Sequence, residues 1–276
     1  MNRGLLAQLV ILFIITQAMG LAVGDFLINE QIRTSIVNDD PESVDNSLGL
    51  IAWVLVFTAM LILVIRFAPE WLLTIILKGI ESLTVFGTSI IVLLPTKLAD
   101  EIILGAAALS VAVRIIFSKN IWLRNASSVV AAAGAGALIG ASLGVVPVFV
   151  FIVLLAIYDF IAVFKTKHMV ELAKGVTKKN LSFTYALPTK EHQFELGTGD
   201  MVIPLAFSVS VLATVKDTMI YPFFFLPPVM ILVASLAGLL VTMHFASLKK
   251  GMALPALPLQ TLLMLIVFGL TRLVGF

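Results

Sequence analysis

The 276-residue chain is 60% hydrophobic and only 12% charged, whereas soluble domains are roughly 45–50% apolar and about 25% charged. This composition excludes an ordinary soluble domain and predicts a protein whose solvent is lipid. The net charge of +2 is spread along the chain, which gives no reason to expect a nucleic-acid partner. The chain has no cysteine, three histidines and no HExxH string, so disulfides, thiolate chemistry and a zinc protease lack support. We expect neither metal nor cofactor, and acid/base chemistry that depends on carboxylates.

Nine apolar windows approach the length of about 20 residues that a helix needs to cross a bilayer. They predict an all-α polytopic membrane protein with nine transmembrane helices. The fifth and sixth windows are separated only by a tight turn at Gly144 and Pro147. The nine windows cover residues 4–24, 48–66, 71–94, 102–117, 125–143, 145–164, 196–215, 222–246 and 254–273.

The first window also has features of a signal peptide. Arg3 precedes its apolar run, and Ala18-Met19-Gly20 resembles a small-x-small cleavage site. The run is nevertheless as long as a membrane span, and the acidic stretch 25–45 that follows looks like an exposed outer loop. These two features favour a first transmembrane helix.

Lysines and arginines, counted by alternate connections, predict the orientation of the helices. With the N-terminus inside, twelve of these residues lie on the inner side and four on the outer side, so we expect the N-terminus inside and the C-terminus outside. The inner set is Arg3, Arg66, Lys119, Arg124, Lys165, Lys167, Lys174, Lys178, Lys179, Lys190, Lys249 and Lys250, and the outer set is Arg33, Lys97, Lys216 and Arg272.

One sizeable polar connection divides the chain. We expect an N-terminal six-helix part at 1–164, an inner polar loop at 165–195 and a C-terminal three-helix part at 196–276. No internal repeat is evident, which disfavours inverted-repeat transporters. In the fifth window Gly136, Gly140 and Gly144 recur every four residues, a spacing that is typical of close helix packing in lipid.

Three acidic residues fall inside predicted spans, where ionisable groups are costly and often functional. They are Glu81, Asp159 and Asp200. At 1.5 Å per helical residue, Asp159 lies about 9 Å and Asp200 about 6 Å from the inner ends of the sixth and seventh spans. Two antiparallel helices would therefore hold carboxyl groups at one depth. Glu81 has Lys78 three residues earlier, so we interpret it as half of a local ion pair.

A pair of aspartates at one site can perform general acid/base catalysis. Their mutual repulsion keeps one protonated while the other is ionised. The ionised partner draws a proton from water as the water attacks a carbonyl carbon, and the protonated partner donates to the carbonyl oxygen. Either aspartate alone could equally be a structural group that bonds a neighbouring helix.

The residues around the two aspartates add three short motifs. Two glycines precede the second aspartate in Gly197-Thr198-Gly199-Asp200, where missing side chains allow close approach of a backbone. Tyr158 precedes Asp159 and could lend a hydroxyl group or be an ordinary interface aromatic. The last span opens with Pro255-Ala256-Leu257, which alone is only a proline at a helix start.

Taken together, YD in the sixth span, GxGD in the seventh and PAL before the ninth resemble the GxGD intramembrane aspartyl proteases, the family of presenilin and signal peptide peptidase. The chain looks most like an archaeal presenilin homologue. The resemblance implies a presenilin-like fold and an aspartic endopeptidase that cleaves single-span transmembrane substrates. It implies Asp159 and Asp200 as catalytic residues and a site shaped by Tyr158, Gly197, Gly199, Pro255, Ala256 and Leu257. Self-cleavage in the short inner loop is not expected.

The partners that follow from this interpretation are transmembrane peptides or proteins and the lipid bilayer, with no nucleic acid. The expected location is the plasma membrane of a prokaryote. The sequence leaves open whether the protein forms a homo-oligomer. The sequence offers two alternatives, another kind of protease and a protein of a different class. A rhomboid-like serine protease is suggested by Gly140-Ala141-Ser142-Leu143-Gly144, but His244 falls at the other end of the bilayer. An ion or proton-coupled transporter or channel could also use buried carboxylates.

A short segment before Asp200 has the pattern of a strand. From Leu181 to Leu187 apolar residues alternate with Ser, Thr and Ala, and Pro188 ends the run. An unwound substrate needs new backbone partners in lipid, and a sheet edge supplies them. We therefore predict that this segment either pairs with an extended substrate or is an ordinary loop hairpin.

Overall fold

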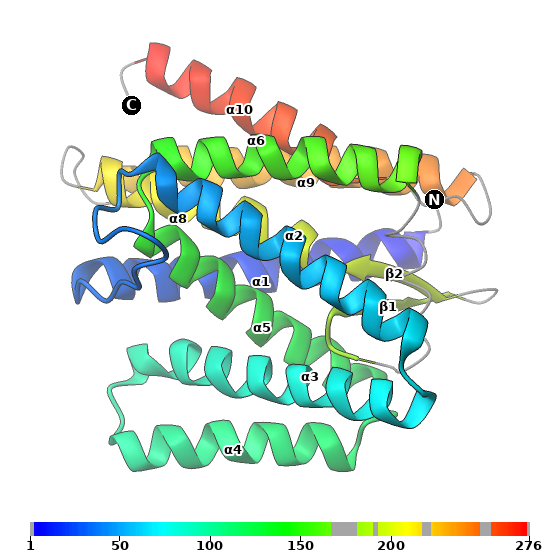
Figure 1. The fold of residues 1–276 in the computed structure, drawn as a ribbon. Coiled ribbons are helices and arrows are strands. Elements are labelled where there is room, and N and C mark those ends of the chain that lie inside the picture. Colours follow the sequence, from blue (N-terminus) through cyan, green and yellow to red (C-terminus); the bar gives the residue numbers. More distant parts are fainter. Residues whose placement is uncertain (1–2, 167–180, 190–192, 217–221, 249–254, 275–276) are drawn as a thin grey trace.

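The computed structural model describes residues 3–166, 181–189, 193–216, 222–248 and 255–274. Within those ranges the chain forms nine α-helices and one antiparallel β-hairpin (Figure 1). The helices are α1 (Arg3–Asn29), α2 (Val44–Phe67), α3 (Glu70–Leu93), α4 (Asp100–Ile116), α5 (Ile121–Ser142), α6 (Val145–Ile161), α8 (Gly199–Val215), α9 (Leu226–Leu248) and α10 (Leu257–Leu273). The strands are β1 (Thr184–Pro188) and β2 (Gln193–Gly197).

Six of these helices are long and apolar enough to cross a membrane, and α8 and α10 are shorter apolar helices of 17 residues. The predicted polytopic helical architecture is confirmed. Part of the expected inner loop, residues 167–180 and 190–192, lies outside the described residues. The seventh span was expected to begin at residue 196, but the chain is in strand β2 until Gly197 and turns into helix only at Gly199.

Several helix starts follow from local sequence. Ser43 caps α2 by accepting the N–H of Asp45 at 3.3 Å. Asn120 caps α5 by accepting the N–H groups of Trp122 and Leu123. These side-chain oxygens satisfy donors that the first helical turn leaves without a partner. Pro69 precedes α3 and Gly144 precedes α6, so the chain reverses sharply at both places.

Helix α8 lies in the middle of the bundle, where it packs against α5, α9, α1 and α6 (Figure 1). Small residues permit this close packing. A Cβ at Gly20 would overlap Leu205, and a Cβ at Gly140 would overlap the main-chain oxygen of Ala206. The predicted packing role is therefore confirmed for Gly136 and Gly140, which both face α8, whereas Gly144 instead abuts Glu42. Close packing makes α8 the most buried helix around the site.

The hairpin completes the end of the bundle at which α1 begins, and α10 ends at the opposite end (Figure 1). Its register pairs Tyr185 with Leu196 and Ala186 with Glu195. Tyr185, Ala186 and Leu187 are fully buried. The hairpin is a small addition to the helical fold: the alternating segment does form a strand, which pairs with residues 193–197.

Side chains of α5 fasten the other edge of β1. The amide of Asn125 accepts the N–H of Ala186 and donates to its carbonyl oxygen, both at 2.8 Å. The hydroxyl of Ser128 donates to the carbonyl oxygen of Thr184 at 3.2 Å, and Gln8 of α1 donates to that of Pro188 at 3.1 Å. Strand β1 is thus an inner strand with partners on both edges.

Candidate active site

Asp159 lies near the end of α6, where the last turn passes into a short π-helix at Ala162–Thr166. The preceding apolar run from Val145 forms the helix, and its buried face includes Val148, Phe151, Ile152 and Leu155. This face packs against the core and leaves Asp159 half-buried toward α8 and α10. The end of α6 therefore presents one carboxyl group beside two other helices.

Asp200 is the second residue of α8 and is also half-buried. It was expected four residues into its helix, but the strand at 193–197 delays the helix start. Helices α6 and α8 run in opposite directions (Figure 1), so the end of one meets the beginning of the other. The two carboxyl groups lie close enough for their charges to interact. The structure therefore brings Asp159 and Asp200 together.

The Pro-Ala-Leu segment lies at the same place. Ala256 precedes α10 as its N-cap and is buried, as is Leu257. The backbone N–H of Leu257 donates a hydrogen bond to the carboxyl group of Asp159. N–H groups in the first turn of a helix have no helical acceptor, so they are available for such a contact. The start of α10 thus touches the candidate site directly.

Tyr158 lies beside Asp159 but its hydroxyl group turns to another helix. It hydrogen-bonds the side chain of Thr58 on α2. The ring packs against the main core. Tyr158 therefore connects the candidate site to α2, a helix whose span is otherwise largely exposed.

The two glycines of the GxGD string leave open space near Asp200. A Cβ at Gly199 would have no neighbour within 4 Å, and one at Gly197 would meet only the carboxyl oxygen of Asp200, at 3.6 Å. None of the described residues fills this space. Thr198 between them has a different function, since its N–H and its hydroxyl group both donate to the carbonyl oxygen of Phe183 at 3.1 Å.

Arg124 holds the hairpin that leads into Asp200, and its importance was missed from the sequence. It is 1% exposed, forms an ion pair with Glu195 of β2, and donates to the carbonyl oxygens of Leu181 and Thr184 at 2.9 and 3.2 Å. The sequence signal is its spacing from Ser128, because residues four apart share a helix face. A polar face in an otherwise Ala- and Gly-rich helix predicts a polar partner.

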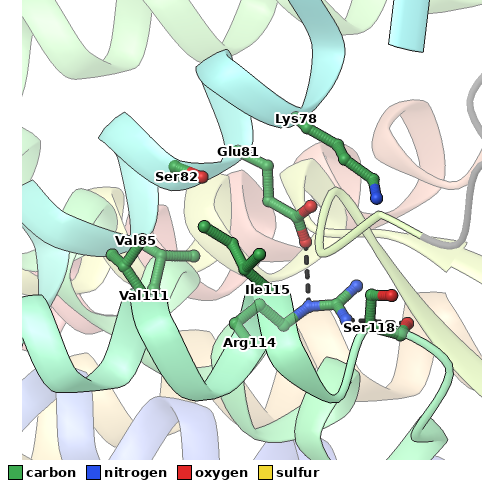
Figure 2. Close-up of a pocket in the computed structure, with 8 residues that line it drawn as sticks. All are labelled: Lys78, Glu81, Ser82, Val85, Val111, Arg114, Ile115 and Ser118. Carbon is green, nitrogen blue, oxygen red and sulfur yellow. Dashed lines mark hydrogen bonds and ion pairs between the residues drawn. The ribbon is translucent and has the colours of Figure 1, made fainter. Parts of the chain in front are cut away.

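The third intramembrane acid, Glu81, belongs to a separate cluster. Its carboxyl oxygen accepts from Arg114 of α4 at 2.9 Å and from the N–H and hydroxyl of Ser182 at 2.7 and 2.6 Å. Figure 2 shows Glu81 directed at Arg114, while Lys78 extends from the same helix without reaching the acid. Glu81 does form an ion pair, as expected, but the predicted partner Lys78 was wrong and the partner is Arg114. Packing of α3 on α4 brings Arg114 closer than sequence proximity brings Lys78.

Three other arrangements concern the chemistry of the site: a cation beside the aspartates, a metal site and a Ser–His pair. Among the described residues, no cation forms an ion pair with Asp159 or Asp200, and no three acidic or histidine side chains gather as a metal site. Ser142 lies at the end of α5 and accepts the N–H of Thr34 at 3.0 Å. His244 lies near the end of α9, at the opposite end of the bundle (Figure 1), so a Ser–His pair is excluded.

Comparisons with known proteins agree with this geometry. Two solved structures, both titled as a presenilin family intramembrane aspartate protease, resemble the whole chain. The one in space group C222 has a TM-score of 0.72 at 20% identity and covers 98% of this chain and 99% of that one. The one in space group P2 has a TM-score of 0.67 at 24% identity, with 97% of each chain covered. No curated protein matches.

These likenesses show that the chain has the presenilin fold. The family model described as "Signal-peptide peptidase, presenilin aspartyl protease" matches residues 10–270, which is nearly the whole sequence and includes α6, α8 and the start of α10. The match excludes the transporter alternative and assigns a class of chemistry. The chain is a multi-pass membrane protein that belongs to the signal-peptide peptidase and presenilin family of intramembrane aspartyl proteases.

Proposed function

We propose that Asp159 and Asp200 are the catalytic pair and that they hydrolyse peptide bonds of single-span transmembrane substrates. One observation carries this proposal: two carboxyl groups from antiparallel helices lie within electrostatic reach of each other. No described cation pairs with either of them. Two carboxylates in such a site repel each other, which favours the state in which they share a single proton.

A shared proton allows peptide hydrolysis without a cofactor. The ionised aspartate takes a proton from water as the water oxygen attacks the carbonyl carbon, and the other aspartate donates its proton to the carbonyl oxygen. The C–N bond then breaks as the amine takes a proton from one aspartate, and a hydroxyl group of the intermediate returns its proton to the other aspartate as the carboxylic acid forms. Both protons are accounted for, and the pair returns to its singly protonated state.

The neighbouring residues keep the roles that the family resemblance implied. The N–H of Leu257 orients the carboxyl group of Asp159, and Pro255 and Ala256 place that N–H at the start of α10. Tyr158 braces the end of α6 against Thr58. The space beside Gly197 and Gly199 receives the main chain of the substrate, which has no side chain of the protein to displace there.

We place the substrate strand on β2 instead of β1. The backbone groups of Ala186 face α5, and because residues in an antiparallel ladder alternate, those of its partner Glu195 face away from β1. The same alternation turns the backbone groups of Gln193 and Gly197 to the open side. Among the described residues, strand β2 therefore has the open edge, and it ends three residues before Asp200. An extended substrate that pairs there is carried to the carboxyl pair.

The variant Gln193→Pro tests the open edge. Proline removes one outward N–H and leaves the bonds between β1 and β2 in place. We expect a several-fold fall in kcat/KM on a transmembrane peptide. Gln193→Ala is the matched control, because it removes the side-chain contact to Glu195 at 2.6 Å but keeps the N–H. Equal rates for the two variants would refute strand pairing at β2.

The lysine and arginine count leads us to propose that the hairpin end of the bundle faces the inside of a prokaryotic plasma membrane. Substrates with an outside N-terminus are then preferred. Cysteines introduced singly at the exposed positions Asp39 and Lys119 test the orientation in intact cells with a membrane-impermeant label. Labelling at position 119 from outside would contradict this orientation and indicate the opposite one.

Activity is tested with purified protein and a labelled single-span peptide in lipid. We expect cleavage within the apolar segment of the peptide, identified by the masses of the two products. A hydroxyl-containing transition-state analogue of aspartic proteases should block it, since such compounds bind far more tightly than substrate. Cleavage only outside the apolar segment, or cleavage that the analogue does not inhibit, would contradict the proposed function.

A further inference from the structure

The main-chain carbonyl of Asp200 lacks its usual helical partner. In an α-helix each carbonyl oxygen accepts the N–H four residues ahead. Four residues after Asp200 stands Pro204, inside α8, and proline has no N–H. The residue that carries one of the two carboxyl groups therefore begins a helix with a gap in its hydrogen-bond ladder.

A side chain of α10 fills that gap. Gln260 is 0% exposed, and its Nε2 donates to the carbonyl oxygen of Asp200 at 3.3 Å. A carbonyl oxygen can only accept, which fixes the orientation of the amide group. Gln260 follows Leu257 by three residues, so the two lie on one face of the first turn of α10. That single turn thus binds the carboxyl group of Asp159 and the main chain of Asp200.

A second glutamine makes a similar bond with a different consequence. Gln17 of α1 donates through Nε2 to the carbonyl oxygen of Met201 at 3.1 Å. By the helical pattern that carbonyl also accepts the N–H of Leu205, so Gln17 supplements an existing bond. Among the described residues, Gln260 is the one side chain that donates to the carbonyl of Asp200.

We propose that Gln260 is a positioning residue that replaces the N–H removed by Pro204 and fixes Asp200 against α10. Asp159 is fixed to the same turn through Leu257, so α10 sets the distance between the two carboxyl groups. This inference rests on the proposed function in that it treats Asp200 as catalytic. Gln260 acts through Asp200 alone, and its role is to hold the main chain from which the carboxyl group extends.

A double-mutant cycle between Gln260→Leu and Pro204→Ala tests this role. Gln260→Leu should lower kcat by about 10- to 100-fold with little change in KM, because a misplacement of about 1 Å can cost 10²-fold. In the Pro204→Ala background, residue 204 regains an N–H that the Asp200 carbonyl can accept. There the same Gln260→Leu change should lower kcat by less than about threefold, since coupled sites are not additive.

Two other variants serve as matched controls. Thr261→Val removes a neighbouring buried hydroxyl that has no partner among the described residues, and it should leave kcat unchanged. Gln17→Leu should cost less than Gln260→Leu, because the Met201 carbonyl keeps its helical donor. An equal fractional loss of kcat from Gln260→Leu in both backgrounds would overturn the proposal, as would an effect on KM alone.

Thermal unfolding of the four proteins of the cycle gives a readout independent of proteolysis. Gln260→Leu should lower Tm by several degrees when Pro204 is present and by clearly less in the Pro204→Ala background. Equal shifts in Tm would overturn the proposal even if the catalytic pair is correct. Full activity of Asp200→Asn, together with coupled Tm shifts, would instead refute the catalytic pair. Gln260 would then hold the main chain of Asp200 without any effect on catalysis.

Discussion

Among the described residues, acidic groups at membrane depth lie at two sites, one at Glu81 and one at Asp159 and Asp200, which differ in the charge that faces each acid. Glu81 meets Arg114 at 2.9 Å, with side chains 8% and 4% exposed, and its oxygen also accepts from Ser182. Asp159 instead faces another acid, Asp200. An acid with a cation and satisfied hydrogen bonds is a structural element, whereas two acids that face each other form an unstable arrangement that costs stability.

The location of the two clusters fits this division. The Glu81–Arg114 pair joins α3 and α4 at the periphery and ties them to the segment before β1. The aspartates lie where α6, α8 and α10 meet. Beside them is the space left open at Gly197 and Gly199. Burial of a charge in a membrane helix is therefore not by itself a sign of catalysis. The sign of the neighbouring charge distinguishes the two cases.

The largest expected effect comes from removing one member of the aspartate pair. Asp159→Asn or Asp200→Asn should each lower peptide hydrolysis by more than about 10³-fold, because one carboxyl group cannot supply both proton transfers. Folding should persist, since an asparagine relieves the repulsion between two acids. Turnover on the labelled peptide and thermal unfolding measure the two effects. Substantial turnover by either folded variant would contradict the distinction between a catalytic aspartate pair and a structural Glu81.

The next largest effect belongs to the structural pair and acts on stability. Glu81→Gln leaves the guanidinium group of Arg114 without its charge partner and should lower the free energy of unfolding by about 3–5 kcal/mol. The double variant Glu81→Leu with Arg114→Met should recover only part of that loss, because it removes the unpaired charge but leaves the buried N–H of Ser182 without its acceptor. Activity per folded molecule should stay near that of the unmodified protein in both. An inactive but stable Glu81→Gln would give Glu81 a catalytic role.

A smaller effect should follow from disturbing the packing that holds α8. Gly140→Ala places a methyl group against the main-chain oxygen of Ala206 and should cost about 1–3 kcal/mol of stability, as overpacking does. Gly105→Ala is the matched control, because a Cβ there has no neighbour within 4 Å. Chemical denaturation in detergent compares the two. Equal stabilities would show that the contact between α5 and α8 adjusts at no cost.

Much of the fold could be predicted from the sequence because apolar runs long enough to cross a bilayer have few other interpretations. The same runs placed the two aspartates together, since antiparallel neighbours with carboxyl groups near one end must meet there. The partner of Glu81 could not be predicted this way. Lys78 is nearest along the chain, but the packing of two helices selected Arg114.

The hairpin was predicted only in part. Alternation between Leu181 and Leu187 indicated a strand, yet nothing local showed that residues 193–197 would pair with it or that Arg124 and Asn125 would close its other edge. Such partners are set by tertiary contacts. Gln260 was also missed, although Pro204 placed four residues after Asp200 indicates a carbonyl that needs a donor from elsewhere.

The central claim is that Asp159 and Asp200 act as one unit on one reacting group. It is tested most directly by equilibrium binding of a hydroxyl-containing transition-state analogue and its deoxy counterpart to the unmodified protein, Asp159→Asn, Asp200→Asn and the double variant. If both carboxyl groups bind the same hydroxyl, each single variant should lose at least about 10²-fold in affinity, the double variant should lose little more, and the deoxy compound should bind all four alike. Losses that multiply in the double variant, or an equal loss with the deoxy compound, would contradict a shared catalytic centre.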